Sequence, residues 1–201
     1  EVTPDKEIVF TTDDWGEKTG RLSDGSRLNY PNDAHIENEE QLLITDRNNN
    51  RCVLTDRSGT ILWEYSDGIY HPHNCDMLPN GNIIISDSDN NRAIEVNREK
   101  EIVWEYGGST EKLNWPRDAD KLENGNVLFA DSKNSRVIEV NVEGKEVWSY
   151  EVSHFGMFYD ADKLENGNIL ATDQFHRQVL EIDPFGNVVW QFRNAAILYP
   201  I

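Results

Sequence analysis

Residues 117–148 read RDADKLENGNVLFADSKNSRVIEVNVEGKEVW, and this pattern decides the fold. The same 32-residue unit recurs without gaps at residues 32–63, 73–104 and 159–190. Each copy ends in tryptophan, and an aspartate stands 17 residues before it, at Asp46, Asp87, Asp131 and Asp173. All variation in length falls in the connectors, so the period is 41, then 44, then 42 residues. A fixed core with variable connectors indicates one structural unit per repeat.

Each unit predicts four short strands. The first precedes an Asn-Gly pair, as in 74–78, and the pairs at 80–81, 124–125 and 166–167 favour type I′ hairpins. The second strands are predicted at 42–45, 83–86, 127–130 and 169–172, the third at 93–96 and its equivalents, and the fourth at LWEY, VWEY, VWSY and VWQF. No segment shows helical periodicity. Four strands per repeat of about 42 residues predict an all-β propeller of four-stranded blades, with the tryptophans packed between neighbouring blades.

The predicted boundaries follow the repeat, with four full blades and a partial fifth. Residues 1–31 form the terminal strand of a partial blade plus a long connector, and 32–72, 73–116 and 117–158 form blades 1, 2 and 3. Residues 159–201 form blade 4 and the start of the next repeat. Because an open sheet edge favours association, we expect a larger or partner-completed propeller. The alternative is four blades that close alone, with residues 7–12 paired onto an edge. Residues 11–31 are a candidate rim loop over one propeller face.

The charge balance excludes several classes of protein. The chain has 37 acidic and 19 basic residues among 201, a net charge of −18. Nucleic acid and anionic membrane surfaces are disfavoured as partners, because both require positive charge. No apolar run reaches 18 residues, so membrane insertion is not expected. Cys52 and Cys75 match no zinc motif and are interpreted as small buried free thiols. The sequence assigns no cellular location, although an extracytoplasmic one is favoured.

One column of polar residues begins the first strand of each repeat. We expect its members to surround one end of the central channel and to bind a ligand there. They are Asn32, His73, Arg117 and Tyr159.

Two further columns in the first strand are rich in aspartate. Asp33, Asp118 and Asp160 form one, and Asp76, Asp120 and Asp162 form the other, two residues later. Because buried carboxylates need partners, the favoured interpretation is a repeated network with Arg51, Arg92 and Arg136 or with backbone groups. The alternative is a ring of carboxylates along the channel, in which Asp76, Asp120 and Asp162 bind Ca²⁺. Apart from that alternative, no metal or cofactor is predicted.

The repeat resembles two groups of propellers. Pro72, Gly81-Asn82, Asp87, Asn90, Arg92 and Glu95-Val96 match NHL-type repeats. The stretch HPHNCDMLPNGN at 71–82 is similar to the HHD-x-x-x-L-P-N-G-N motif of the PAPS-independent arylsulfotransferase family. That resemblance implies transfer of a sulfuryl group between phenols through a histidine, with His73 and Arg117 as the catalytic residues. The aspartate of the motif is Asn74 here, so any role of that aspartate in orienting the histidine does not carry over to this chain.

Two hypotheses of function follow. The leading one is a binding or scaffold module with a small-molecule ligand or protein partner at the channel mouth or rim loops. The alternative is an arylsulfotransferase-like enzyme, so the sequence leaves open whether the chain is an enzyme. Self-association, or a second chain that completes the propeller, is the further partner that the sequence suggests.

Overall fold

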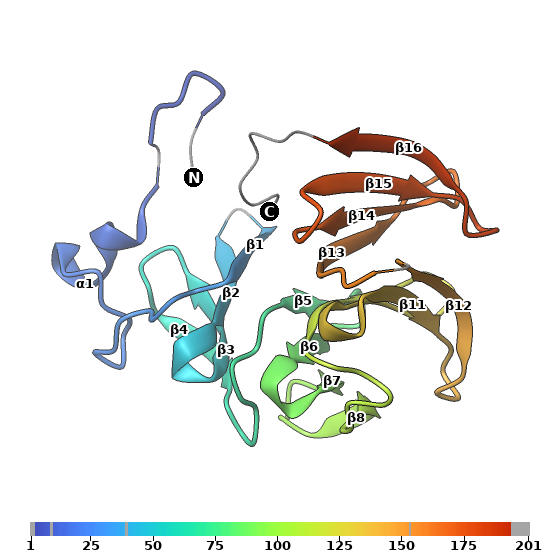
Figure 1. The fold of residues 1–201 in the computed structure, drawn as a ribbon. Coiled ribbons are helices and arrows are strands. Elements are labelled where there is room, and N and C mark those ends of the chain that lie inside the picture. Colours follow the sequence, from blue (N-terminus) through green and yellow to red (C-terminus); the bar gives the residue numbers. More distant parts are fainter. Residues whose placement is uncertain (1–2, 9, 39, 153, 194–201) are drawn as a thin grey trace.

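A computed structural model describes residues 3–8, 10–38, 40–152 and 154–193. Its strands form four sheets of four, each antiparallel and in chain order (Figure 1). Blade 1 contains β1 (Asp33–Asn38), β2 (Gln41–Asp46), β3 (Arg51–Asp56) and β4 (Ile61–Tyr65), and blade 2 contains β5 (Cys75–Met77), β6 (Ile83–Asp87), β7 (Arg92–Val96) and β8 (Ile102–Gly107). Blade 3 contains β9 (Pro116–Lys121), β10 (Val127–Asp131), β11 (Arg136–Val140) and β12 (Glu146–Glu151), and blade 4 contains β13 (Phe158–Lys163), β14 (Ile169–Asp173), β15 (Gln178–Ile182) and β16 (Val188–Arg193).

Among the described residues, helical structure is confined to single turns. These are η1 (Thr12–Asp14) and α1 (Trp15–Lys18) before blade 1, and η2 (Arg47–Asn49), η3 (Ser88–Asn90) and η4 (Ser132–Asn134) in the polar turns between second and third strands. Within the described ranges, no helix is long and apolar enough to cross a membrane. The predicted all-β propeller of four-stranded blades is confirmed.

The four blades are arranged around a central channel, and the first strand of each blade lines it. The Tyr159 hydroxyl lies 3.4 Å from Oδ1 of Asn32, which brings blade 4 to blade 1 at the channel mouth. Farther from the axis, the strands of these two blades stand apart (Figure 1). The other successive blades pack face to face.

Neighbouring blades bury a repeated set of side chains. In blade 3, for example, Leu128, Ala130 and Val137 pack on Phe158, Ile169 and Leu180 of blade 4, and all six are at most 2% exposed. Trp148 and Tyr150 of the outermost strand extend the same contact. We call this side of a blade, which meets the next blade in the chain, its trailing face. The predicted packing of Trp63, Trp104 and Trp148 between blades is confirmed, since each joins such a cluster.

The Asn-Gly turns form hairpins, but not of the predicted type. Gly81 has φ +84°, whereas Asn80 is absent from the positive-φ residues, and a type I′ turn needs positive φ at both. Instead, the Gly81 N–H donates to the Leu78 carbonyl, and Gly81 then supplies the left-handed residue that returns the chain to the sheet. The turn extends over Pro79 as well, so it is one residue longer than a two-residue type I′ loop.

The arginines of the repeat bind a different set of aspartates from the one expected. Nε of Arg51, Arg92 and Arg136 donates to the aspartate that ends the second strand of its own blade, at 2.7–2.8 Å. Those partners are Asp46, Asp87 and Asp131, each 0% exposed. The network therefore fastens the polar turn within a blade, and the prediction that these arginines bind the first-strand aspartates is wrong. The predicted backbone partner is found for Asp118, which accepts from the Ala161 N–H of the next blade at 3.2 Å.

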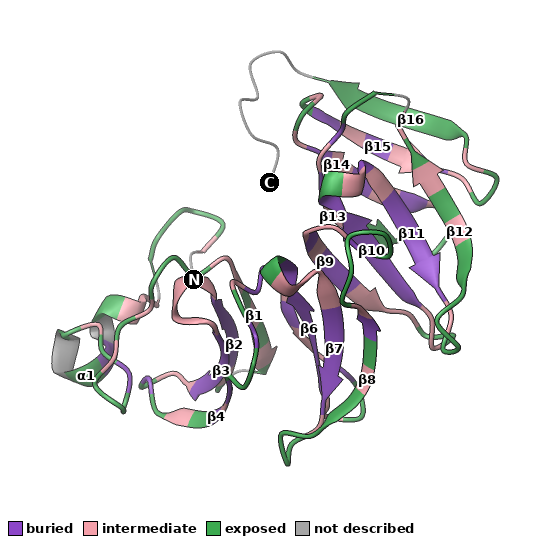
Figure 2. Ribbon diagram, turned by 60° about the horizontal axis from the view of Figure 1, so that its bottom comes forward, coloured by how far each residue is buried: buried purple, intermediate pink, exposed green. Residues whose placement is uncertain are grey.

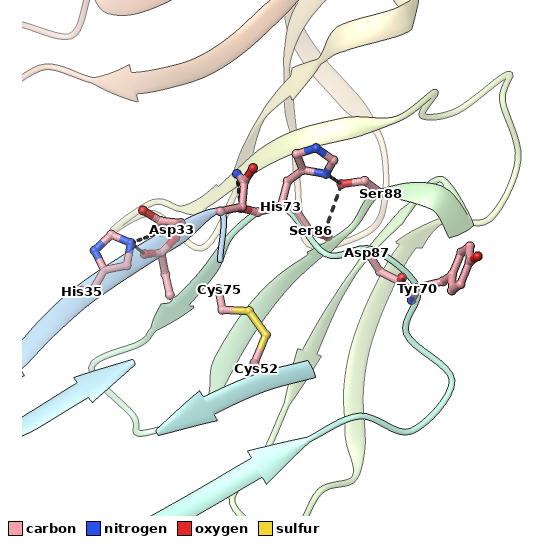
Figure 3. Close-up of a disulfide and its surroundings, with 11 residues drawn as sticks. Asp33, His35, Cys52, Tyr70, His73, Cys75, Ser86, Asp87 and Ser88 are labelled. Atoms are coloured by element: carbon pink, nitrogen blue, oxygen red, sulfur yellow. Dashed lines mark hydrogen bonds and ion pairs between the residues drawn. A yellow bond between two sulfur atoms is a disulfide. The ribbon is translucent and has the colours of Figure 1, made fainter. Parts of the chain in front are cut away.

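The two cysteines are joined in a disulfide, which corrects the prediction of free thiols. Cys52 of β3 and Cys75 of β5 bond with Cα atoms 6.4 Å apart, and the bridge links blade 1 to blade 2 (Figure 3). Both are buried in the cluster between these blades. The repeat places small residues at the equivalents of Cys52, so burial was predictable, but the pairing depends on the approach of two blades.

Residues 11–31 are not a loop over a face of the propeller. Trp15 and Leu22, with Phe10 and Leu28, pack on Leu42 and Ile44 of blade 1 and thereby cover the side opposite its trailing face. The terminal strand of a partial blade, predicted before residue 11, shows only an isolated bridge at Ile8 among its described residues. The predicted start of a fifth repeat after residue 193 lies outside the described residues.

Candidate functional site

The channel contains a cavity of about 250 Å³, bordered by the first strands of all four blades. All four residues predicted to bind ligand line it, and they are close together at its mouth. The Asn32 amide donates to the His73 carbonyl at 2.8 Å, and the Tyr159 hydroxyl reaches the Asn32 amide oxygen. We call Asn32, His73, Arg117 and Tyr159 the mouth residues. The column in the repeat was thus a correct guide to residues that are 127 positions apart.

His73 is 3% exposed, and one of its ring nitrogens is fixed. Nδ1 lies 2.8 Å from the Ser88 hydroxyl (Figure 3). That hydroxyl itself donates to the Pro116 carbonyl. Because Ser88 has a single hydroxyl proton and gives it to the carbonyl, it accepts from Nδ1–H of His73. This assigns the Nδ1–H tautomer, and it leaves the lone pair on Nε2. That nitrogen points away from Ser88 (Figure 3).

The imidazole of His73 is held neutral. Burial first, and then the nearby positive charges of Arg117 and Arg47, lower its pKa to about 3. A neutral imidazole with a fixed tautomer can accept a hydrogen bond or act as a nucleophile through Nε2 at neutral pH.

Arg117 is enclosed by aromatic rings. Its guanidinium carbon lies 4.0 Å from the ring centre of Tyr159 and 4.4 Å from that of Trp115. Its hydrogen-bond partner is the side-chain oxygen of Gln174 at 3.2 Å, and its buried Nε has none within the described ranges. Burial lowers the pKa of Arg117, and no carboxylate pairs with it among the described residues. An arginine in this state offers unused donors to an anion.

Other cations surround the mouth. Lys133 Nζ lies 4.3 Å from the ring centre of Trp115, and the charge of Arg47 acts on both His73 and Arg117. Asp89 is the nearby counter-charge, although it is already bonded to His71 Nδ1 at 2.7 Å and to Trp115 Nε1 at 2.8 Å. Three cations, Arg117, Arg47 and Lys133, therefore lie at or near the mouth in a chain whose net charge is −18.

The same cavity is lined by carboxylates. We call these six aspartates the acidic belt: Asp33, Asp76, Asp118, Asp120, Asp160 and Asp162. His35 is the one cation among them, with Nε2 2.5 Å from Asp33 and 2.9 Å from Asp76 (Figure 3). Hydrogen bonds to these two carboxylates raise the pKa of His35 to about 11, so it is an imidazolium.

The belt holds more negative charge than His35 neutralises. Burial, followed by the charges of Asp120, Asp160 and Asp76, raises the pKa of Asp118, which is 3% exposed. Burial and neighbouring aspartates likewise raise the pKa of Asp120 to about 7. Asn74 replaces the aspartate of the arylsulfotransferase motif. Its side chain donates to Asp118 of the acidic belt at 2.6 Å and does not orient His73.

The structure groups the aspartates differently from the predicted Ca²⁺ ligands. Oxygens of Asp76, Asp118 and Asp120 lie within 4.8 Å of one another, whereas Asp162 is outside that group. Asp33, His35 and Asp76 form a second such group. Cation binding by the belt stays a prediction.

Several residues of the site were missed by sequence reasoning. Ser88, His35 and Trp115 lie outside the predicted ligand column. Trp115 shares one signal with Tyr30 and His71, since each is an aromatic residue directly before a proline and has φ between +46° and +57°. A bulky residue in this region is strained, and such strain gathers at functional sites.

Comparison with known proteins identifies the fold of the chain but assigns it to no family. No protein-family model and no curated protein sequence matches the chain. A streptogramin B lyase structure is 14% identical with TM-score 0.68, covering 84% of this chain and 56% of the other. An inactive virginiamycin B lyase from Staphylococcus aureus with quinupristin is 16% identical with TM-score 0.67, covering 89% and 63%. The WD40 propeller domain of Doa1 is 14% identical with TM-score 0.63, covering 74% and 49%.

These similarities support a β-propeller, and at such identities they extend to the fold alone. The chain spans between about half and two thirds of the length of these structures. In its architecture, the chain is a β-propeller whose central cavity is lined by both the mouth residues and the acidic belt.

Proposed function

We propose that this propeller is a binding module whose channel mouth takes a small molecule with an anionic group next to an aromatic ring. The observation that carries the proposal is Arg117, which lies between Trp115 and Tyr159 without a carboxylate partner in the described part of the chain. An oxyanion can accept from the guanidinium, while a ring can stack against the neighbouring aromatic side chains. Nε2 of His73 and the Asn32 amide supply further polar contacts at the same place.

The location of positive charge supports an anion over a cation at the mouth. An anion bound there is close to Arg47, Arg117 and Lys133, whereas a cation would be drawn toward the acidic belt. The charge of the mouth also removes one objection to an anionic ligand, which is that a chain with net charge −18 repels it. Local charges dominate over distant ones because salt screens the latter within about 8–10 Å.

Calorimetric titration with 4-nitrophenyl sulfate tests this function, with 4-nitrophenol as the uncharged comparison at pH 6. We expect Arg117→Gln to weaken binding of the sulfate ester by about tenfold or more, since it removes a charge-assisted pair. Arg98→Gln is the matched control, because Arg98 stacks on Trp63 and is not among the residues that line the cavity. Equal binding by the Arg117 and Arg98 variants contradicts the proposal.

Sulfuryl transfer through His73 is the second candidate function. It is favoured by the neutral imidazole and by the Nδ1–H···Ser88 bond, which together leave the Nε2 lone pair available. In this reaction Nε2 attacks sulfur, the bond from sulfur to the aryl oxygen breaks, and the phenolate leaves with the electron pair. A second phenol then attacks sulfur, its proton passes to solvent, and the imidazole is regenerated.

Release of 4-nitrophenol from its sulfate in the presence of a phenol acceptor tests the second candidate. We expect His73→Ala to abolish turnover. We expect Ser88→Ala to reduce turnover, because His73 then loses the hydrogen bond that fixes its Nδ1–H tautomer. His154→Ala is a control for loss of a histidine in a connector. Absence of turnover, or turnover that persists in the His73 variant, excludes this reaction without affecting the binding result.

A further inference from the structure

The trailing faces of the four blades are built from equivalent residues. Five positions recur on each trailing face. The second strand contributes an aliphatic residue and a small residue, and the third strand contributes one small or β-branched residue. The fourth strand contributes the tryptophan and a second aromatic residue. In blade 4 these are Leu170, Thr172, Val179, Trp190 and Phe192.

Three of these faces are covered and the fourth is open. Blade 1 buries all five positions, with Trp63 at 7% and Tyr65 at 2% exposure. In blade 4 none of the five is buried, and Trp190 and Phe192 are 49% and 42% exposed. Every residue of β16 is exposed, and the strand is green along its length in Figure 2. The two exposed rings are stacked, with centres 6.4 Å apart, as they are in the covered blades.

At two of the three covered faces, those of blades 1 and 3, the tryptophan makes a specific hydrogen bond to the next blade. Trp63 Nε1 donates to the Arg98 carbonyl and Trp148 Nε1 to the Pro184 carbonyl, both at 3.1 Å. Each acceptor lies in the turn between the third and fourth strands of the following blade. Within the described ranges, Trp190 has no such acceptor.

Blade 1 does not supply the missing acceptor, because its place is already filled. Its equivalent carbonyl, that of Arg57, accepts from Trp15 Nε1 at 3.1 Å. The Arg57 guanidinium lies 5.2 Å from the ring centre of Phe10, much as Arg98 lies 5.5 Å from that of Trp63. A Cβ at Gly59 would lie 2.7 Å from Trp15, so the indole fits closely against this turn. Residues 10–15 thus imitate the trailing face of a preceding blade.

We propose that the trailing face of blade 4 is the docking surface for a fifth four-stranded blade supplied by a partner polypeptide. The occupant has an apolar face of small and β-branched residues, like β14 and β15, and a free main-chain carbonyl between its third and fourth strands to accept from Trp190. The three interfaces within this chain are the template for the contact. A second copy of the chain fits poorly, because its own Trp15 fills the required place on blade 1 and both copies have a charge of −18.

An extended protein tests the proposal directly. In this extended protein, a second copy of residues 158–193 is added after Ile201. The added blade offers Trp190 the same face that blade 4 packs against Trp148 of blade 3. Hydroxyl-radical footprinting then compares oxidation of Trp190 with that of Trp148 in the same molecule. We expect oxidation of Trp190 to fall several-fold, to the level of Trp148, and Trp190→Ala to lower the melting temperature as much as Trp148→Ala does. Unchanged oxidation of Trp190 in a folded extended protein overturns the proposal.

A second variant keeps the test decisive if the added blade does not fold. Trp15→Ala removes the indole that bonds to the Arg57 carbonyl and covers the side of blade 1 opposite its trailing face. Blade 1 then offers a free carbonyl between its third and fourth strands, as the proposed occupant does. Sedimentation at micromolar concentration should show that this variant associates head to tail, and that Trp15→Ala combined with Trp190→Arg remains monomeric. Association that persists with Trp190→Arg contradicts the proposal. A dimer of the unaltered chain that protects Trp190 also does so, because it assigns the face to a second copy.

Discussion

Two sets of aspartates recur in this protein, and they differ in what surrounds them. Asp87 represents the turn set, and it is 0% exposed. It accepts from the Tyr70 N–H at 2.7 Å (Figure 3). It also accepts from Arg92 Nε at 2.7 Å and from Asn90. Asp120 stands for the acidic belt, where burial and neighbouring carboxylates raise its pKa to about 7. The first set stabilises each blade, whereas the second is held together against its own repulsion.

The difference shows that repetition does not by itself identify a structural role. A turn aspartate recurs because each blade needs one to fasten its polar turn and its incoming connector. A belt aspartate recurs because the first strand of each blade faces the same channel, where copies from different blades meet. Native structures retain unfavourable local interactions chiefly where a site requires them. Variants of both sets can therefore break or sharpen this comparison.

The largest effect is expected from a turn aspartate. Asp87→Ala removes the partner of Arg92 and leaves the Tyr70 N–H without its acceptor, so we expect it to lower the free energy of unfolding by about 3–5 kcal/mol. Urea denaturation at pH 7 measures the change. Asp67→Ala in an exposed connector is the control, with an expected change below about 0.5 kcal/mol. If the two variants unfold alike, the turn set is not structural.

The disulfide is expected to have the next largest effect. Cys75 lies between Asn74 and Asp76, so the bond to Cys52 fixes a belt strand against blade 1. The bond closes a loop over a sequence separation of 23, and its reduction should cost about 2–4 kcal/mol by freeing the unfolded chain. Urea denaturation with and without reductant measures it, and the Cys52→Ser/Cys75→Ser double variant should be insensitive to reductant. A reduced chain of unchanged stability contradicts the expectation.

A belt variant should have the opposite sign. The pKa of Asp120 is raised above its unfolded value of about 3.8, so its charge opposes folding above about pH 7 and this penalty fades as the pH falls toward 4. Asp120→Asn should therefore raise the free energy of unfolding by about 1–2 kcal/mol at pH 8 and by little at pH 4.5. Thermal unfolding at both pH values measures the difference. A gain that does not depend on pH shows that charge is not its cause.

The smallest effect concerns the one turn that departs from the pattern. In blade 4, Asp173 is bonded to Gln178 and His176 where the other blades use arginine and asparagine. Gln178→Arg restores the ion pair, and we expect a gain below about 1 kcal/mol, because the new side chain gives up hydration and breaks the bond from Gln191 to Gln178. Unfolding in low and high salt separates an ionic gain from other causes. A destabilised variant implies that blade 4 is adapted to glutamine.

Much of the site was predictable because the repeat converts position in the sequence into position around an axis. Asn32, His73, Arg117 and Tyr159 share one column, and they therefore meet at one end of the channel. The partners of these residues were not predictable in the same way. Both partners occupy repeated positions, since Ser88 corresponds to Ser132 and Trp115 to Tyr30 and His71. Their contacts with His73 and Arg117 nevertheless depend on side-chain directions, which the repeat does not specify.

The sequence by itself determined the blade. The spacing of Asn-Gly turns, β-rich runs and tryptophans predicts four antiparallel strands, since these features act over a few residues. The tertiary structure decided what happens between blades: the disulfide of Cys52 and Cys75, the charge of the belt, and the use of Trp15 in place of a preceding blade. These depend on distances between segments that are far apart in the chain, and local propensities do not specify such distances.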